Sequence, residues 1–236
     1  MSTLAKEPIF GELRGCEWMW RWRAFQLLSV TTIQPAFETE RLRLRPFVLG
    51  DAPVLQRLAG RREIADTTIA IPHPYSLKMA EEWICEQACW VIGGKSVVFA
   101  VERKADVQLV GAVGLRNIDR EHAQAEMGFW VGVEWWGKGY ASEAARGALC
   151  FGFGQLGLNR IYAHHMVRNP ASGRVLERIG MRREGLLRQR VRKWGVFEDV
   201  VLLAILRADW VGDAAAERHG SAPAAVRAGE DASPRL

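Results

Sequence analysis

The sequence predicts an α/β domain in which helices cover a mixed sheet. The first observation is the order of its periodic segments: a strand, two helices, three strands, a helix, a strand, a helix and two final strands. The second is composition, since 49% of the 236 residues are hydrophobic, which is ample for a buried core. The third is the stretch from Glu126 to Leu149, where a strand pattern passes through a glycine-rich turn into a helix pattern.

The domain is expected to span residues 37–211, with a segment of different composition at each end. Residues 1–36 form an N-terminal extension of undefined order, in which the stretch 16–25 is dense in tryptophan and arginine. Arginines interrupt its apolar part, which excludes a secretory signal. An amphipathic surface segment, a partner-binding arm and a start codon assigned too early all fit this extension. Residues 212–236 are rich in alanine, glycine, proline and charge, which predicts a disordered tail.

The first elements are identified mainly by the residues at their ends. We expect a strand over 42–45 and helices over 51–58 and 76–90. Pro46 ends the strand, because proline cannot donate to a sheet. Asp51 and Ser76 are of the residue type that caps a helix at its N-terminus. The loop between the helices carries His73 between two prolines, and both a structural turn and the wall of a substrate site fit it.

The second half of the domain returns to strands, with two further helices inserted between them. We expect strands over 97–103, 109–115, 126–133, 161–167, 184–191 and 198–206, and helices over 140–156 and 169–179. Asn169 and Pro170 fit the cap and the first position of the last helix, since the missing N–H of proline costs nothing there. Gly180 ends that helix.

The glycine turn, Gly137-Lys138-Gly139, separates the central strand from its helix. The first N–H groups of a helix have no partner inside it and carry partial positive charge, and glycines let a phosphate approach them. A Walker loop would need Ser or Thr after Gly137-Lys138 to reach magnesium. A Rossmann fingerprint would need Gly or Ala where Ser142 stands. The turn therefore predicts a cradle for the phosphate of another kind of ligand.

Charge, cysteines and histidines narrow the possible partners. The formal net charge of +5 favours acidic partners such as a coenzyme pyrophosphate or a ribosome surface, but the basic residues are scattered, and we expect no direct nucleic-acid binding. The cysteines lack zinc spacing and the histidines are dispersed, so we predict no metal site. No apolar run is long enough to cross a membrane. Unpatterned cysteines are typical of reduced thiols, and we predict a cytoplasmic protein.

The glycine turn resembles the acetyl-coenzyme A loop of the GNAT acyltransferases, which is written Q/R-x-x-G-x-G/A. The match is Gly137-Lys138-Gly139, continued by Tyr140-Ala141. Glu134 departs from the pattern, because it stands where the family has Gln or Arg. That position lies at the entrance of the turn and leaves the row of backbone amides in place.

Further motifs extend the resemblance over roughly residues 37–210. The run 169–181 is similar to the GNAT signature N-x-x-S-x-x-V-L-x-x-G-F, with Met181 in place of the aromatic residue. The runs 39–45 and 194–199 resemble the RimJ/RimL branch, which acetylates the N-termini of ribosomal proteins. The resemblance implies a GNAT fold: a mixed, largely antiparallel sheet flanked by helices on both faces, with the central strand splayed from the next one.

The resemblance also implies acetyl-CoA as the co-substrate, lying in the opening of the sheet. Its pantetheine arm would pair with the backbone around Val131 and Val133, and its pyrophosphate would lie on the amides of the turn. The cofactor-binding residues expected on this basis are Val131, Val133, Gly137, Lys138, Gly139, Tyr140, Ala141, Ser142 and Asn169. Each of these roles has an alternative. Val131 and Val133 also fit ordinary core positions, and Lys138 fits a solvated loop position. Asn169 also fits the cap of a helix.

Acetyl transfer requires a neutral amine, which then attacks the thioester. Deprotonation of the ammonium group costs less than ~1 kcal/mol near neutral pH for an α-amine with a pKa of ~8. For a lysine with a pKa of ~10.4 it costs about 4 kcal/mol. Glu126 is the candidate base, and an ion pair with an arginine is its alternative role. The resemblance implies Ser172 as proton donor to the departing thiolate; a hydroxyl that stabilises the first helical turn is the alternative. Tyr140 is a second candidate donor.

These inferences predict an N-acetyltransferase that moves an acetyl group from acetyl-CoA to a primary amine, the N-terminal α-amine of a ribosomal protein. The same chemistry on a small amine (an amino acid, a polyamine or an aminoglycoside) is an alternative. A non-catalytic acyl-CoA-binding module is another. An enclosed acidic pocket would favour a small amine, and an open groove a peptide. A homodimer is compatible with the sequence.

Overall fold

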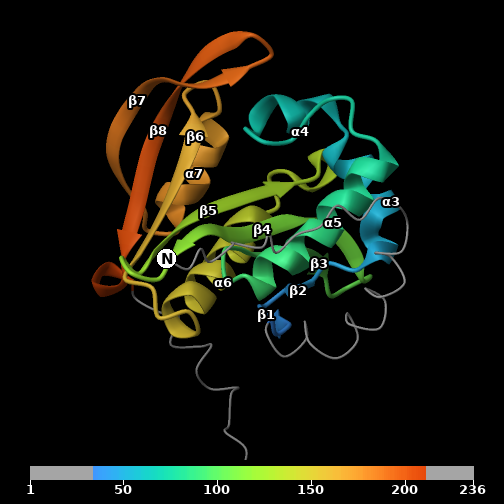
Figure 1. The fold of residues 1–236 in the computed structure, drawn as a ribbon, viewed down its shortest axis with the longest axis horizontal. Helices are drawn as coiled ribbons and strands as arrows, with labels where there is room; N and C mark the ends of the chain where they lie inside the picture. The colour runs from blue at the N-terminus through green and yellow to red at the C-terminus, as the bar shows by residue number, and fades with distance from the viewer. Residues whose placement is uncertain (1–33, 211–236) are drawn as a thin grey trace, which may run out of the picture.

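An eight-stranded sheet runs through the protein in the order β1-β2-β3-β4-β5-β6-β8-β7 (Figure 1). The computed structural model describes residues 34–210. The strands are β1 (Phe37–Glu38), β2 (Leu42–Pro46), β3 (Val97–Arg103), β4 (Gln108–Asp119), β5 (Gln124–Val131), β6 (Arg160–Met166), β7 (Arg182–Lys193) and β8 (Val196–Leu206). Neighbouring strands are antiparallel except β5 and β6, which run parallel. The predicted mixed, largely antiparallel sheet is confirmed.

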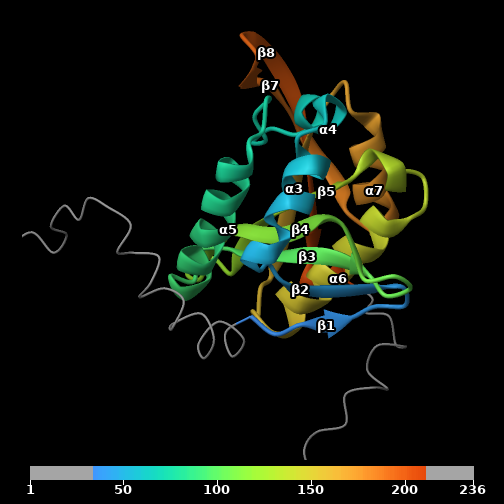
Figure 2. The same ribbon diagram turned by 90° about the vertical axis from the view of Figure 1, so that its right-hand side faces the viewer.

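Helices cover both faces of this sheet, as Figure 2 shows for α5 and α7. They are α3 (Ala52–Ala59), α4 (Arg62–Thr67), α5 (Leu77–Ile92), α6 (Tyr140–Gly154) and α7 (Pro170–Arg178). One core forms around α6, where Leu149 packs with Leu115 and Met127 of the sheet. A second core forms on the other face, where Leu55 of α3 and Ile84 of α5 pack with Ala100. The central strands of the sheet are therefore buried on both sides.

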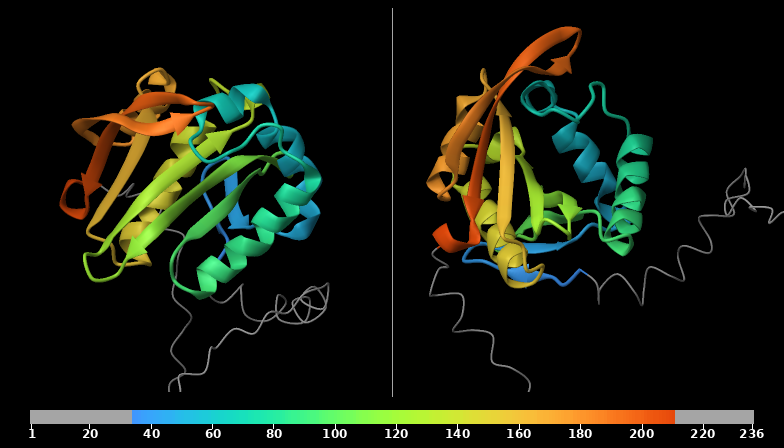
Figure 3. Two further views of the ribbon diagram at one scale, coloured as in Figure 1. Left: turned by 45° about the horizontal axis from the view of Figure 1, so that its top comes forward. Right: turned by 60° about the vertical axis from the view of Figure 1, so that its left-hand side comes forward.

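The central strands β5 and β6 separate part of the way along the sheet (Figure 3). Their parallel ladder runs only from Gln124 with Arg160 to Met127 with Ala163. On its other side β5 stays paired with β4 as far as Val131 with Gly111. The edge of β5 from Gly128 onward is therefore open, which is the splay that the family resemblance implied.

Several element boundaries differ from the sequence predictions. Helix α4 was missed, because six residues show too little periodicity. Strand β5 ends at Val131, and Val133 begins a short 3-10 turn, Val133–Trp135, so the prediction of a strand through Val133 is wrong. Asp51 precedes α3 as predicted but makes no capping hydrogen bond to that helix. Its carboxylate instead accepts hydrogen bonds from Arg45, at 2.8 and 2.9 Å, and from the backbone N–H of Val48 at the start of the preceding 3-10 turn, at 2.9 Å.

The described chain begins slightly before the predicted domain start. Gln34 has an exposed fraction of only 3%, and its Nε2 donates to the backbone oxygen of Val98 in β3, at 2.8 Å. Residues 1–33 and 211–236 lie outside the described residues. The predicted N-terminal extension and disordered tail fall largely there and stay predictions.

Candidate active site

The glycine turn has the backbone geometry that glycine makes possible. Gly137 and Gly139 have φ angles of 74° and 81°, in the left-handed region that residues with a Cβ rarely adopt. Gly139 is the N-cap of α6, so the N–H groups of the first helical turn begin directly after it. A Cβ at Gly137 would meet nothing within 4 Å, so the turn is open on that side. The prediction of a strand, a glycine turn and a helix is confirmed.

Arg41 of the loop before β2 closes one side of the glycine turn. Its Nε lies 2.7 Å from a carboxylate oxygen of Glu143 in the first turn of α6, and its Nη1 donates to the backbone oxygen of Lys138 at 3.1 Å. Burial raises the pKa of Glu143, but hydrogen bonds from Thr39 and Arg41 outweigh it and hold that pKa below its ordinary value. Arg41 therefore compensates the negative charge of Glu143, which would otherwise repel an anion bound at this end of the helix.

The open edge of β5 presents backbone groups that no strand covers. The N–H of Gly132 donates to Val110 of β4 at 2.8 Å. Because alternate residues of a strand point the same way, the N–H and C=O of Phe129 and Val131 point away from β4, toward the opening. The indole of Trp136 already donates to the Val131 oxygen at 2.6 Å. The N–H groups of Phe129 and Val131 are thus placed to pair with an extended ligand, whereas Val133 lies in the 3-10 turn.

The remaining predicted cofactor residues lie around the glycine turn, except Asn169. Tyr140 and Ser142 are each 8% exposed, and Ala141 stands between them in the first turn of α6. The Tyr140 ring lies 4.9 Å from the Arg41 guanidinium, and Tyr140 does not line the cavity described next. The Lys138 ammonium lies 4.7 Å from the centre of the Trp135 ring. This cation–π contact keeps a positive charge beside the turn.

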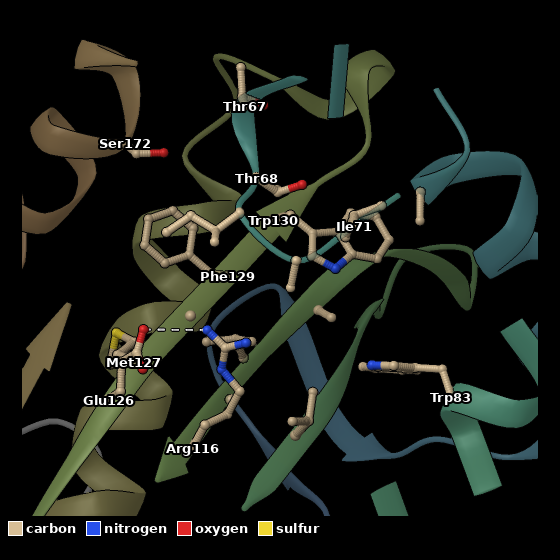
Figure 4. A pocket seen from close by; sticks show the side chains of 18 of the residues that line it. Thr67, Thr68, Ile71, Trp83, Arg116, Glu126, Met127, Phe129, Trp130 and Ser172 are labelled. Atoms are coloured by element: carbon tan, nitrogen blue, oxygen red, sulfur yellow. Dashed lines mark ion pairs between the residues drawn. The ribbon is translucent and has the colours of Figure 1, made fainter. Parts of the chain in front are cut away.

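A cavity of about 330 Å³, here called the aromatic cavity, lies on the α3 and α5 side of the sheet where β5 and β6 separate (Figure 4). Its floor is formed by β4 and β5, and its far wall by β6 and α7. Its lining includes five aromatic residues: Tyr75, Trp83, Trp90, Phe129 and Trp130. The segment of residues 67–72, which starts at the last residue of α4 and is here called the cover loop, lines it from above (Figure 4). Both predicted catalytic residues, Glu126 and Ser172, line this cavity.

The Glu126 carboxylate is held by groups from three strand positions. Asn117 donates to it at 2.9 Å, and Arg116 and the Nδ1 of His164 each lie 3.5 Å from its Oε1. The hydrogen bond from His164 is the main cause that holds the pKa of Glu126 below its ordinary value; burial opposes it and the charge of Arg116 adds to it. Glu126 is thus ionised at neutral pH, faces the cavity and is also paired with an arginine.

The Ser172 hydroxyl lies on the wall of the aromatic cavity opposite Glu126 and can donate its hydrogen. Asn169 caps α7 as predicted: its Oδ1 accepts from the Ser172 N–H at 3.3 Å, and its Nδ2 donates to the Ser172 Oγ at 2.9 Å. A hydroxyl that accepts through its oxygen keeps its own hydrogen for another acceptor. The same Asn169 Nδ2 also donates to the Thr67 oxygen at 3.2 Å, which joins α7 to the cover loop.

Sequence reasoning missed the residues that complete the cavity. Arg116 lies across Gly128, where an added Cβ would meet its Nη2 at 3.0 Å. Asn117 reaches Glu126 from an irregular point of β4 and has a φ of 50°, a local bend that re-aims a side chain. His164 is two residues beyond Tyr162, the β6 partner of Glu126. A signal was available for His164, because it lies in the predicted strand over 161–167, the next strand after the central one.

The cover loop is fastened by residues from the far end of the chain. Lys193 of β7 is 7% exposed, and its Nζ donates to the Ile71 oxygen at 2.8 Å. Arg168 contacts Asp66 through its carboxylate at 2.9 Å and its backbone oxygen at 2.8 Å. The cavity wall therefore depends on hydrogen bonds between segments about a hundred residues apart in sequence.

Residues 34–210 contain neither a cluster of metal ligands nor a helix suited to a membrane. Within this range no group of three or more His, Cys, Asp or Glu side chains is placed to hold a metal ion. None of the helices there is both long enough and apolar enough to cross a membrane.

Comparison with known proteins identifies the family. Residues 41–182, more than half of the chain, match the Acetyltransferase (GNAT) domain. The chain belongs to the GNAT acetyltransferases, and the predicted family, fold and enzyme class are confirmed. An "Uncharacterized N-acetyltransferase p20" of Bacillus licheniformis is 32% identical over 174 residues, which cover 74% of this chain and 97% of that protein.

Relatives with named acceptors are of two kinds. The [ribosomal protein uS5]-alanine N-acetyltransferase of Escherichia coli is 29% identical over 118 residues, 50% of this chain and 61% of that protein. The crystal structure of spermidine N-acetyltransferase from Vibrio cholerae, in complex with CoA and spermine, has 29% identity and a TM-score of 0.64, covering 72% of this chain and 98% of that one. N-acetyltransferase chemistry is common to these relatives, and the acceptor differs between them.

Proposed function

We propose that this N-acetyltransferase acetylates the N-terminal α-amine of a polypeptide, with a ribosomal protein as the leading substrate. The observation that carries the proposal is the charge of the aromatic cavity. Among the described residues that line it, Glu126 is the only carboxylate, and Arg116 already compensates that charge at 3.5 Å. A polyamine carries several ammonium groups, which would need several carboxylates. One partly compensated carboxylate suits an acceptor with a single amine.

The glycine turn and the open edge of β5 are proposed to hold acetyl-CoA, which supplies the acetyl thioester. The first amides of α6 and Lys138 would face the pyrophosphate, because an anion is favoured at a helix N-terminus. The N–H groups of Phe129 and Val131 would pair with the pantetheine arm. Asn169 caps α7 and is engaged with Ser172, so it is assigned to the support of the site.

Two side chains of the aromatic cavity are proposed to accept and donate the protons that move during acetyl transfer. Glu126 attracts the ammonium group and accepts its proton, directly or through a water. The neutral nitrogen then attacks the carbonyl carbon, a C–N bond forms, the nitrogen loses its second proton to water, and the C–S bond breaks with its electron pair on sulfur. The Ser172 hydroxyl donates a proton to the departing thiolate and regains one from water. A carboxylate with a lowered pKa is a weak base, which suits an α-amine near pKa ~8 better than a lysine near ~10.4.

The experiment is a screen for thiol release from acetyl-CoA with three groups of acceptors: peptides with a free α-amine, the same peptides blocked at that amine but carrying lysine, and polyamines. We expect turnover with the first group, and mass spectrometry should place the acetyl group on the α-nitrogen. Turnover with polyamines alone would overturn the proposal in favour of a small-amine acetyltransferase. Binding of acetyl-CoA without turnover in any group would favour the non-catalytic module.

A further inference from the structure

The aromatic cavity is polar at one end and apolar at the other. Glu126, Arg116 and Ser172 occupy the end beside the opening of the sheet, as Figure 4 shows. Trp83 and Trp130 lie at the other end (Figure 4). An amine held at Glu126 would therefore direct the rest of its residue toward the two indole rings.

The apolar end is a fixed wall. Trp83, Trp130 and Tyr75 pack against the core cluster of α3 and α5, which holds them from behind. The Trp83 ring also makes an edge-to-face contact with Phe47, with ring centroids 5.1 Å apart. Such a contact favours one arrangement of the two rings. The wall is thus preformed, and a ligand that fills it does not have to order it first.

The size of the cavity exceeds what a small first residue needs. About 330 Å³ lies within the range of pockets that hold small organic ligands, of roughly 300–1,000 Å³. If the first residue of the bound peptide were alanine, with its amine at Glu126, its methyl group would leave the indole rings without a contact. A large apolar side chain would bury its surface against them, and this burial is favourable in proportion to its area.

The two tryptophans also offer directed polar groups. In Figure 4 both indole rings turn their nitrogen edge toward the interior of the cavity. An indole N–H is a donor only, so it selects an acceptor such as a carbonyl oxygen. A peptide supplies a carbonyl beside its α-amine and its first side chain, and a simple alkylamine does not.

From this arrangement we infer that the acceptor is a polypeptide whose first residue has a large apolar side chain, such as leucine or phenylalanine, which lies between Trp83 and Trp130. This inference rests on the proposed function and adds the identity of the first residue. It departs from the alanine in the name of the Escherichia coli relative. The aromatic cavity is thus a specificity site for the residue that bears the amine.

The test is a matched series of peptides that differ only in the first residue: alanine, serine, leucine or phenylalanine before one lysine-free tail. We expect kcat/KM to be at least about tenfold higher for leucine and phenylalanine than for alanine, which is the size of effect that apolar pockets give. Equal values, or a preference for alanine or serine, would overturn the inference while leaving the proposed function intact.

A variant series assigns the preference to the cavity. Trp83→Ala should lower kcat/KM for the phenylalanine peptide by about tenfold more than for the alanine peptide. An equal loss for both peptides would contradict the inference. Should Trp83→Ala fail to fold, Trp83→Leu keeps an apolar side chain there and should shift the preference from phenylalanine toward leucine. Acetyl-CoA affinity, measured by calorimetry, shows that each variant is folded.

Amino acid amides separate this inference from the proposed function. Phenylalaninamide and alaninamide carry the same α-amine and carbonyl without a peptide chain. A preference for phenylalaninamide, with every peptide inert, would reject the polypeptide substrate and retain the apolar specificity site. Alaninamide acetylated as fast as phenylalaninamide would reject the specificity site.

Discussion

The aromatic cavity lies along strand β5, the glycine turn follows that strand in the chain, and the two regions are built in opposite ways. The turn is local: its strand, its two glycines with positive φ and its helix follow one another in the chain. The cavity is assembled from α3, the cover loop, α5, β4, β5, β6 and α7. Hydrogen bonds from Asn169 and Lys193 hold its cover loop in place.

This difference suggests that the two regions divide the work. The local turn, with its backbone amides, is the part proposed to hold the phosphate of the coenzyme. A wall made from distant segments can change residue by residue while the turn stays the same, which suits the acceptor. Substitutions at the turn should therefore change coenzyme affinity, and substitutions around the cavity should change the rate or the acceptor.

The largest effect is expected at Glu126. Glu126→Gln keeps the shape of the side chain and removes the proton acceptor, so kcat/KM should fall ~10²-fold or more. The loss should shrink toward pH 9, because more of the α-amine, with its pKa of ~8, is then already neutral. Because the pKa of Glu126 lies below its ordinary value, the carboxylate is ionised throughout pH 6 to 9 and adds no step of its own to the wild-type profile.

The matched control is Glu184→Gln, since Glu184 pairs with Arg160 and does not line the cavity. It should leave the rate within about twofold, as surface ion pairs contribute little. If Glu126→Gln kept the wild-type kcat across pH 6 to 9, Glu126 would have a structural role and would not be the base.

An intermediate effect is expected at Lys193, which lies outside the cavity but holds its cover loop. Lys193→Met keeps the buried stem and removes the hydrogen bond to the Ile71 oxygen. Hydrogen bonds from charged groups are worth ~1.5–3 kcal/mol, and we expect part of this in acceptor binding, as a roughly three- to tenfold rise in KM. Steady-state kinetics should show kcat and acetyl-CoA affinity nearly unchanged. A lower acetyl-CoA affinity with an unchanged acceptor KM would contradict the division between the two regions.

A smaller effect is expected at Ser172. A thiol with a pKa of ~8.5 leaves without much help, so Ser172→Ala should lower kcat only a few-fold. The loss should be greatest above pH 8, where a proton from solvent is scarcer. Ser172→Thr keeps a hydroxyl and serves as the control. If Ser172→Ala and Ser172→Thr lose activity equally, the role of Ser172 is to support the first turn of α7.

The smallest effect concerns the start of the domain. A chain of residues 34–210 keeps the hydrogen bond from Gln34 to Val98, and a chain of residues 37–210 loses it. One such bond is worth ~1 kcal/mol, which corresponds to a lower Tm by roughly 2–4 °C. Thermal unfolding of the two chains should show this difference, with the longer one within a few degrees of the full chain. Identical melting of the two would show that Gln34 adds nothing.

The same comparison explains how much the sequence alone could predict. Periodicity and turn residues act over a few neighbours, so they predicted most of the succession of helices and strands along the chain, the glycine turn and the Asn169 cap. The placement of Glu126 and Ser172 in one cavity was reached through the family resemblance. Arg116 and Lys193 could not be assigned, because their contacts depend on strand pairing and on a loop whose partners lie far away in the chain. Helix α4 was too short for a periodic signal.

The central claim, that the glycine turn holds the coenzyme and the cavity serves the acceptor, is tested most directly by calorimetry of acetyl-CoA binding to three variants. Gly139→Glu places a side chain and a negative charge in the turn and should weaken binding at least tenfold, about 1.4 kcal/mol. Gly154→Glu makes the same change in open space at the other end of α6 and should leave the affinity unchanged, as should Glu126→Gln in the cavity. An unchanged affinity for folded Gly139→Glu, or an equal loss in Gly154→Glu or Glu126→Gln, would contradict the claim.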